Sequence, residues 1–215
     1  FHRELELDKP AGYEIPDAHR MNASIWGGHY DYYHLNYMQL LPENTLSDQF
    51  AAFQKGNWLL SFRHGSMIFI LDKDTKEVVW RAIYDQVDGN LEGQHSPQML
   101  PNGKILIMDN GRYREWSRVI ELDPITLDIT WQFKAPWFYS LSQSHAQRLP
   151  NGNTLITEAE DGHVFEITNE GEIVWEYYHT DKQGPTNSVV EEKWGKRQEI
   201  YKMERYDADF IEQFL

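Results

Sequence analysis

The fold is decided by a phrase that stands at residues 149–156, LPNGNTLI, because two related phrases precede it. Residues 100–107 read LPNGKILI, and residues 56–61 read GNWLLS, a shorter version of the same pattern. Asn and Gly accept the positive φ that a tight hairpin turn requires, and the apolar and β-branched residues that follow favour a strand. The phrase therefore predicts a β-hairpin that recurs three times along the chain.

Each of the three units continues in the same way, with a second apolar run, a polar turn rich in acidic residues and a last strand that carries a tryptophan. These closing residues, Trp80, Trp131 and Trp175, lie 51 and 44 positions apart. Four short antiparallel strands at a period of about 40–50 residues are typical of one β-propeller blade. A β-sandwich is the competing all-β fold, but it gives no reason for the phrase to recur at one period. We therefore predict an all-β β-propeller of four-stranded antiparallel blades.

Three segments are expected along the chain. Residues 1–33 form an irregular N-terminal segment or a divergent partial blade, residues 34–206 form the blades, and residues 207–215 form a C-terminal tail. Within the blades, residues 181–198 are polar and predict a loop, and residues 199–206 predict a final strand. About three and a half blades can be counted, whereas a closed ring normally has four to eight. We expect a divergent blade, missing blades or a second chain to complete the ring.

Composition narrows the classes of function. Aromatic residues make up 14% of the chain, which indicates a packed core and argues against disorder. The net charge of −14 argues against a nucleic-acid partner. The absence of cysteine excludes disulfides, thiolate metal sites and cysteine nucleophiles. No apolar run approaches the roughly 18 residues that a membrane span needs. The chain begins at Phe1, so we expect a processed product, a trimmed chain or a piece of a longer protein.

Histidines precede the repeated strands. His95 and His145 stand eight and seven residues before the turn glycines of their units, and His34 opens the first strand of its own unit. Each histidine would therefore enter the innermost strand of its blade, and radial repetition would bring the three toward one axis. We predict a shared functional site there. The alternative is that these histidines only pack within their blades.

Arginines close to these histidines suggest that the site binds an anion. Arg63 and His64 end the second strand of the first unit, and Arg118 follows a Trp-Ser pair in the second unit. The planar fork of donors on arginine suits tetrahedral oxyanions such as sulfate or phosphate. A salt bridge to one of the many carboxylates is the alternative, and for Arg118 the two interpretations are equally supported.

At these residues the sequence resembles the bacterial arylsulfate sulfotransferases and their fungal and bacterial relatives. The matching phrases extend over roughly residues 26–206. They are DYYHLN at 31–36, SFRH at 61–64, GQH at 93–95, LPNG at 100–103 with DNG at 109–111, SR at 117–118 and AQRLPNGNTLI at 146–156. The resemblance implies a six-bladed propeller, of which this chain would be the C-terminal portion. It also implies a periplasmic or secreted protein, a homodimer in one branch, and no cofactor.

The resemblance further implies that a sulfuryl group moves from an aryl sulfate to a phenol through a covalent histidine. Residue by residue, His95 would be the nucleophile, and His34, Asn36 and Arg63 would hold the sulfuryl oxygens. One more family histidine belongs to an earlier blade and has no counterpart here, and Pro97 soon after His95 departs from the pattern. A neutral imidazole is a good nucleophile near pH 7, and a second histidine would protonate the departing phenolate.

The remaining candidates for substrate binding come from the same neighbourhoods of the chain. His64, Arg118 and His145 are expected to contact the substrate, and aromatic residues in 26–37 and 137–139 are expected either to wall a site for an aromatic ring or to pack the blades.

Two other classes of function stay open. In a metal-dependent lyase or oxidase, His34, His64, His95 and His145 would supply imidazole ligands. Against it, no carboxylate stands at a repeated position among them, and the preferred interpretation assigns no metal ligand. A non-catalytic propeller that binds protein or glycan on one face is the third possibility.

Overall fold

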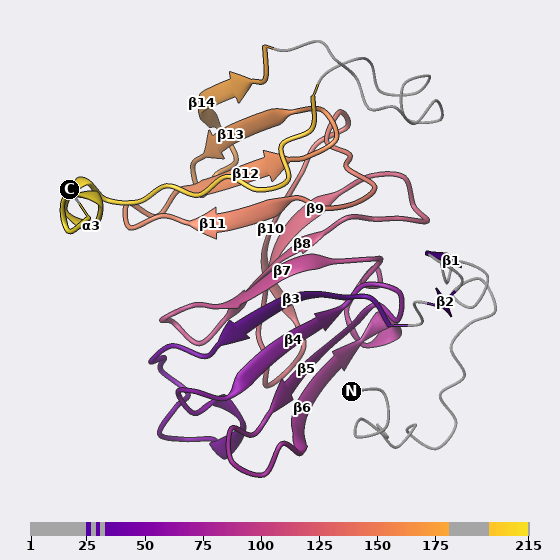
Figure 1. The fold of residues 1–215 in the computed structure, drawn as a ribbon, viewed down its shortest axis with the longest axis vertical. Helices are drawn as coiled ribbons and strands as arrows, with labels where there is room; N and C mark the ends of the chain where they lie inside the picture. The colour runs from indigo at the N-terminus through magenta and orange to yellow at the C-terminus, as the bar shows by residue number, and fades with distance from the viewer. Residues whose placement is uncertain (1–24, 27–28, 31–32, 181–197, 215) are drawn as a thin grey trace.

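The computed structural model describes residues 25–26, 29–30, 33–180 and 198–214. Within them the chain forms three four-stranded antiparallel sheets, one after another along the sequence (Figure 1). In each sheet, strands that follow one another in sequence pair with one another, which confirms the predicted four-stranded blades.

Blade 1 consists of β3 (Leu35–Leu40), β4 (Trp58–Phe62), β5 (Met67–Leu71) and β6 (Val78–Ile83). Blade 2 consists of β7 (His95–Met99), β8 (Ile105–Asp109), β9 (Arg118–Leu122) and β10 (Ile129–Lys134). Blade 3 consists of β11 (His145–Arg148), β12 (Thr154–Glu158), β13 (His163–Ile167) and β14 (Ile173–Tyr178).

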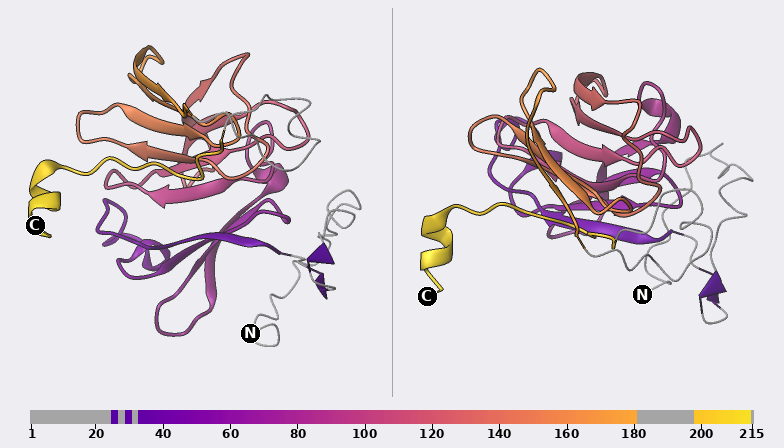
Figure 2. Two further views of the ribbon diagram at one scale, coloured as in Figure 1. Left: turned by 45° about the horizontal axis from the view of Figure 1, so that its top comes forward. Right: turned by 90° about the horizontal axis from the view of Figure 1, so that it is seen from above.

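The first strand of each blade lies innermost. β3 and β4 contact β7, and β11 contacts β7 and β8, so the inner strands stand side by side while the later strands spread outward (Figures 1 and 2). This is the radial arrangement of a propeller. The number of blades in a closed ring stays a prediction.

The predicted Asn-Gly turns form between the first two strands of each blade. Gly56, Gly103 and Gly152 have φ values of 89°, 80° and 88°, which a residue with a Cβ atom adopts only with strain. In the second and third of these turns, the side-chain oxygens of Asn102 and Asn151 each accept a hydrogen bond from the backbone N–H two residues later. The recurring phrase therefore encodes one hairpin geometry.

Two apolar layers hold the blades together. The middle strands are buried on both faces, which explains their continuous apolar runs. The layer between blades 1 and 2 includes Leu59, Ile68, Ile70, Ile105, Ile107 and Ile120, and the layer between blades 2 and 3 includes Leu106, Met108, Val119, Phe133, Ile156 and Phe165. The closing tryptophans join neighbouring blades. Trp80 Nε1 donates to the Pro124 carbonyl at 2.7 Å, and Trp131 Nε1 donates to the Asn169 carbonyl at 2.8 Å.

A glutamine on each inner strand bonds to the backbone of the next. Gln39 Oε1 accepts from the Met99 N–H at 2.8 Å, and Gln98 Nε2 donates to the Ala146 carbonyl at 2.7 Å. Gln147 both donates to the Arg205 carbonyl and accepts from its N–H. Residues 199–206 thus lie against β11 where a further inner strand would stand.

The prediction of a final strand over residues 199–206 is wrong, because this stretch is an extended segment without a strand ladder. Its backbone bonds mainly to the side chains of Gln147 and Thr157, and Ile200 N–H donates to the Ala159 carbonyl. Three complete blades are present in the described residues, where about three and a half had been counted. A short helix, α3 (Ala208–Glu212), follows within the predicted tail.

The other elements are small. β1 (Ile25–Trp26) and β2 (His29–Tyr30) pair as a short antiparallel hairpin, and two 3₁₀ turns, η1 (Ala51–Phe53) and η2 (Tyr84–Gln86), lie in the connections of blades 1 and 2. Most of the predicted irregular N-terminal segment and of the predicted loop at 181–198 falls outside the described residues. In the part that the structure describes, no helix has the length and apolar character needed to cross a membrane.

Candidate active site

A bulge in β7 sets the position of His95. His95 pairs with Met108, and Gln98 pairs with Leu106, so Ser96 and Pro97 stand opposite a single residue of β8. Ser96 has a φ of 50°, and Pro97 has no N–H to donate to the ladder. The bulge therefore accommodates Pro97, at which this sequence departs from the pattern of the family it resembles.

The His95 ring is fixed through both of its nitrogens. Nδ1 lies 2.7 Å from Asn110 Oδ1 and 3.1 Å from the Gly93 carbonyl, and Nε2 accepts a hydrogen bond from the Gln143 N–H at 3.2 Å. Because the partners of Nδ1 are acceptors and the partner of Nε2 is a donor, the proton belongs on Nδ1 and the lone pair on Nε2. Burial, together with the nearby Arg63 and His34, lowers the pKa of His95 to about 3, against a raising effect of Asn110. The ring is therefore neutral at physiological pH.

Arg63 and a pair of histidines share the neighbourhood of His95. The backbone carbonyl of His34 accepts a hydrogen bond from the Arg63 N–H at 3.0 Å, and the rings of His34 and His64 stack with centroids 4.8 Å apart. The half-buried Arg63 donates from Nη2 to the Leu141 carbonyl at 3.2 Å, while its buried Nε has no hydrogen-bond partner among the described residues. Burial and then the charge of Arg112 lower the pKa of Arg63 to about 10, so it is a cation at neutral pH.

Asn36 connects the inner strand of blade 1 to the segment that carries His95. Its Nδ2 donates to the Gln94 carbonyl at 2.7 Å, and its Oδ1 is buried without a hydrogen-bond partner among the described residues. Gln94 Nε2 in turn donates to Ser61 Oγ and to the Met67 carbonyl. The His-x-Asn and Gly-Gln-His phrases therefore meet in space.

A comparison of the sequence with protein families finds a matching family model. The family model described as arylsulfotransferase (ASST) matches residues 23–180, most of the chain. The chain belongs to the arylsulfotransferase family. The match covers the whole of the three blades and includes His34, Arg63 and His95. A search of curated proteins finds no match.

Three solved structures are similar to this arylsulfotransferase-family chain at low identity. They are a protein of unknown function from Bacteroides caccae (15% identity, TM-score 0.42, 57% of this chain and 42% of that chain), a catalytically inactive virginiamycin B lyase from Staphylococcus aureus with quinupristin (14%, 0.46, 70% and 43%) and the hydrazine synthase of Kuenenia stuttgartiensis (12%, 0.42, 72% and 40%). The chain spans about two fifths of the length of each of them.

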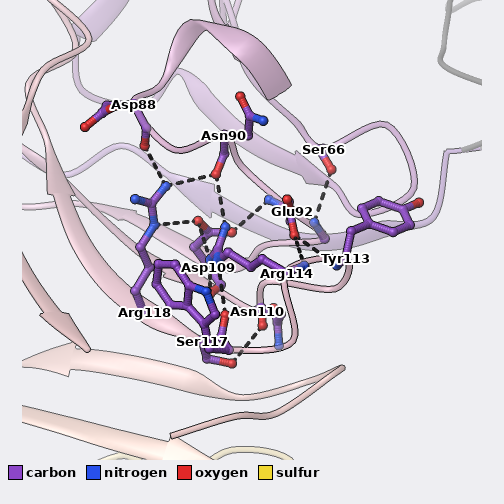
Figure 3. A network of polar contacts seen from close by, with 12 residues as sticks. Ser66, Asp88, Asn90, Glu92, Asp109, Asn110, Tyr113, Arg114, Ser117 and Arg118 are labelled. Carbon is purple, nitrogen blue, oxygen red and sulfur yellow. Dashed lines mark hydrogen bonds and ion pairs between the residues drawn. The ribbon is translucent and has the colours of Figure 1, made fainter. Parts of the chain in front are cut away.

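Arg118 lies in a buried ion-pair network around Asp109, the last residue of β8 (Figure 3). Its Nε donates to Asp109 Oδ2 at 2.8 Å, and its Nη2 donates to the carbonyls of Asp88 and Asn90. Arg114 lies 2.9 Å from the same Asp109 oxygen. These contacts favour the salt-bridge alternative for Arg118, and its predicted contact with substrate gains no support from them.

The network around Asp109 also positions the partner of His95. Ser117 Oγ donates to the Asn110 carbonyl at 2.8 Å, and Asn110 Nδ2 donates to the carbonyls of Ser140 and Gln143 (Ser117 and Asn110 are drawn in Figure 3). Asn110 Oδ1 is thereby directed at His95 by its own amide group.

His145 has different surroundings from the other predicted histidines. Its Nε2 lies 3.4 Å from Glu204 Oε1, and burial and the nearby Lys202 lower its pKa to about 4. Neither ring nitrogen has a hydrogen-bond partner among the described residues. The structure therefore brings His34, His64, Arg63 and His95 together, and it turns His145 toward residues 202–204.

The predicted aromatic wall is divided between packing and the site. The ring of Trp137 contacts Phe133 of blade 2, Phe165 of blade 3 and Phe138 of the connection between them. Tyr139 is buried, and burial and Glu160 raise its pKa to about 12, with Arg112 acting in the opposite direction. Trp137, which is 48% exposed, therefore covers this aromatic cluster from outside, and Tyr139 belongs to the region of Arg112 and Glu160.

Sequence reasoning missed Asn110, although the phrase that contains it was among those that carried the resemblance. Asn110 directly follows the second strand of blade 2, just as Arg63 directly follows the second strand of blade 1. This shared position is the signal that could have identified it. Gln143 gives no such signal, because it acts through its backbone N–H.

A metal centre was the main alternative for the histidines. In the described ranges, no group of three or more His, Cys, Asp or Glu side chains is arranged so that it could hold a metal ion. The metal-enzyme alternative gains no support from the arrangement of His34, His64 and His95.

Proposed function

We propose that this chain carries the reaction centre of a sulfotransferase that moves a sulfuryl group from an aryl sulfate to a phenol through a covalent intermediate on His95. The observation that carries the proposal is the state of His95. Its ring is neutral, Asn110 holds the proton on Nδ1, and the lone pair of Nε2 lies in the neighbourhood of the cationic Arg63. Those are the requirements of a nitrogen nucleophile that attacks an anionic ester.

In the first half-reaction, the Nε2 lone pair attacks sulfur, an N–S bond forms and the S–O bond to the aryl group breaks. The phenolate leaves with that electron pair and takes a proton from the stacked His34–His64 pair. The sulfated ring becomes cationic, and its Nδ1–H keeps donating a hydrogen bond to Asn110 Oδ1. Gln143 N–H must leave Nε2 for this attack, because the lone pair cannot accept a hydrogen bond and form the N–S bond at once.

In the second half-reaction, the oxygen of an acceptor phenol attacks sulfur while the N–S bond breaks. The electron pair returns to Nε2, and the phenol proton returns to the histidine pair, so the site is regenerated. Arg63 stabilises the sulfuryl oxygens in both steps, with the His34 ring in the same region. Asn36 would join them only if its Nδ2 left the Gln94 carbonyl, because its Oδ1 accepts hydrogen bonds and does not donate them.

The setting of this reaction centre is also proposed from the family. We propose a periplasmic or secreted protein in which further blades or a second chain close a six-bladed ring, with a homodimer as one form of the assembly. The small aromatic sulfate or phenol substrate would enter at the inner ends of the blades, where His34 and His95 lie.

The test is intact mass spectrometry after mixing the protein with 4-nitrophenyl sulfate in the absence of an acceptor. The expected result is a mass increase of one SO₃ unit, mapped to His95 by peptide sequencing and removed by adding phenol. His145→Gln is the matched control and should retain the adduct. An adduct that persists in His95→Gln would show that another residue is the nucleophile.

A further inference from the structure

Most buried or half-buried arginines of the described blades pair with a carboxylate. Arg114 and Arg118 pair with Asp109, and Arg148 pairs with Glu121. Arg63 and Arg112 differ, because neither forms an ion pair with any described residue. In a chain with 34 acidic and 20 basic residues, two half-buried cations without a carboxylate partner indicate a place that an anion fills.

The two unpaired arginines are neighbours. Gly93 lies between their side chains, since a Cβ atom built on it would stand 3.4 Å from Arg112 Cβ and 3.9 Å from Arg63 Cγ. The charge of Arg112 contributes to the lowered pKa of Arg63, which shows that the two guanidinium groups repel each other. Gly93 also stands two residues before His95, so this paired charge belongs to the same region as the proposed nucleophile.

One carboxylate approaches the pair through a single residue of the loop. The Leu141 carbonyl accepts a hydrogen bond from Arg63 Nη2 at 3.2 Å, and the Leu141 N–H donates to Glu160 Oε2 at 3.1 Å. Ser142 Oγ donates to the other oxygen, Glu160 Oε1, at 2.8 Å. Burial raises the pKa of Glu160, and the hydrogen bonds from Ser142 Oγ and the Leu141 N–H act in the opposite direction because they stabilise the carboxylate. The group therefore contains two guanidinium groups and the carboxyl group of Glu160, which Glu199 also influences.

We propose that Arg63 and Arg112 form one anion site and that the neighbouring Glu160 shifts its preference toward monoanionic aryl sulfates and away from dianionic aryl phosphates. The sulfuryl group of an aryl sulfate carries one negative charge, and a phosphate monoester approaches two near pH 7. The negative charge of Glu160 repels the dianion about twice as strongly as the monoanion. This inference depends on the proposed function for the assignment of an aryl ester to the site. It adds Arg112 as a residue that binds the ester and Glu160 as a residue that sets the charge preference.

Charge arithmetic makes the inference testable without knowing the geometry of the ligand. A Coulomb energy is proportional to the charge of the ligand, so a change of one protein charge has twice the effect on the binding free energy of a dianion as on that of a monoanion. If Glu160→Gln strengthens 4-nitrophenyl sulfate binding by about threefold, it should strengthen 4-nitrophenyl phosphate binding by about tenfold. Arg112→Gln should weaken both, again with the larger factor for the phosphate ester.

The experiment is calorimetric titration of both esters in the His95→Gln background, where the proposed adduct cannot form. The controls are Arg81→Gln and Glu170→Gln, which make the same charge changes at exposed positions and should leave both affinities within about twofold, because exposed distant charges are screened. Thermal melts check that each variant is folded. An Arg112→Gln protein that binds 4-nitrophenyl sulfate as tightly as the background overturns the inference, and so do equal effects of Glu160→Gln on the two esters or no binding of either ester.

These outcomes are independent of the adduct test. A sulfuryl adduct on His95 together with an Arg112→Gln variant of unchanged affinity would leave the proposed reaction intact and remove the anion-site inference. Charge-dependent selectivity without any adduct on His95 would support the anion-site inference and remove the proposed reaction.

Discussion

His95 and His145 occupy equivalent positions in neighbouring blades and have different surroundings. Each stands on the innermost strand opposite the residue that lies two positions after a buried leucine, Met108 after Leu106 and Thr157 after Leu155. Both rings are buried, and burial lowers both pKa values, to about 3 and about 4. Of the two, only His95 has a ring nitrogen that is hydrogen-bonded to a side-chain amide, that of Asn110. Only His95 also lies near a guanidinium group without an ion pair among the described residues, that of Arg63.

The difference teaches that the repeated strands place the histidines and that the connecting loops decide what each histidine can do. Blade 2 provides Asn110 directly after its second strand, whereas the corresponding residue of blade 3 is Ala159, which has no acceptor for a ring N–H. Blade 3 then supplies the segment that ends in Gln143, which covers His95, while residues 202–204 approach His145. The same arrangement of strands therefore holds an oriented imidazole, our proposed nucleophile, in blade 2 and a packed imidazole in blade 3.

The largest effect should come from exchanging the two histidines for glutamine. His95→Gln should reduce sulfuryl transfer from 4-nitrophenyl sulfate to phenol by about a thousandfold or more, because removal of a nucleophile abolishes the covalent route. His145→Gln should change the rate by less than about threefold, because its ring contacts Glu204 and not the reaction centre. Steady-state release of 4-nitrophenolate measures both. A similar loss of transfer rate in the two variants would show that the different surroundings of His95 and His145 do not decide their roles.

Arg63 should come second. Arg63→Gln removes the cation that stabilises the sulfuryl oxygens, and we expect kcat to fall by about a hundredfold to a thousandfold, the range found for the loss of one charge-stabilising donor. Arg63→Lys keeps the charge without the planar fork and should recover part of the rate. Equal rates for Arg63→Lys and Arg63→Gln would contradict a role for the charge.

A smaller effect is expected at Asn110. Asn110→Leu removes the acceptor that keeps the proton on Nδ1, so His95 should populate the other tautomer and kcat should fall by about tenfold to a hundredfold. Asn110→Asp keeps the acceptor and adds a negative charge, which should raise the pKa of His95 and move the acid limb of the pH–rate profile to higher pH. Unaltered profiles in both variants would argue that Asn110 only supports the loop.

The smallest effect concerns stability in acid. In the unfolded chain these histidines bind protons below about pH 6.5. In the folded chain His145 does so only near pH 4 and His95 only near pH 3. The unfolded state therefore binds more protons over that interval, and stability falls as the pH drops through it, by up to about 1.4 kcal/mol per pH unit for each histidine. Urea titrations between pH 7 and pH 4 should show a shallower decline for His145→Gln than for the parent. An identical decline would contradict the assignment of a neutral, buried His145.

The blades were predictable from sequence because one hairpin phrase recurs and its turn chemistry admits a single geometry. Gly103 and Gly152 mark that turn, and the closing tryptophans mark the last strands. The segment at residues 199–206 was predicted as a strand because its apolar and aromatic residues are interspersed with charged ones and it is extended. Only tertiary contacts show that Gln147 takes the place of a ladder.

The site was predictable only in part, for a physical reason. His34 and His95 were predicted from their positions ahead of the repeated strands and Arg63 from its place at a strand end, and the resemblance to a family added their roles. The separation of His95 from His145 depends on a bulge at Ser96 and on loops that no periodic pattern describes. Arg112 could not be singled out, because its lack of a carboxylate partner is a property of the folded chain.

The central claim is that the lone pair of His95 Nε2 receives the sulfuryl group. Long-range ¹H–¹⁵N spectra of protein labelled with ¹⁵N-histidine, recorded before and after loading with 4-nitrophenyl sulfate, test it most directly. The account predicts that His95 begins with its proton on Nδ1 and a bare Nε2, and that loading shifts Nε2 to the position of a substituted nitrogen while His145 stays unchanged. A His95 signal that does not respond while another histidine becomes substituted would contradict the account.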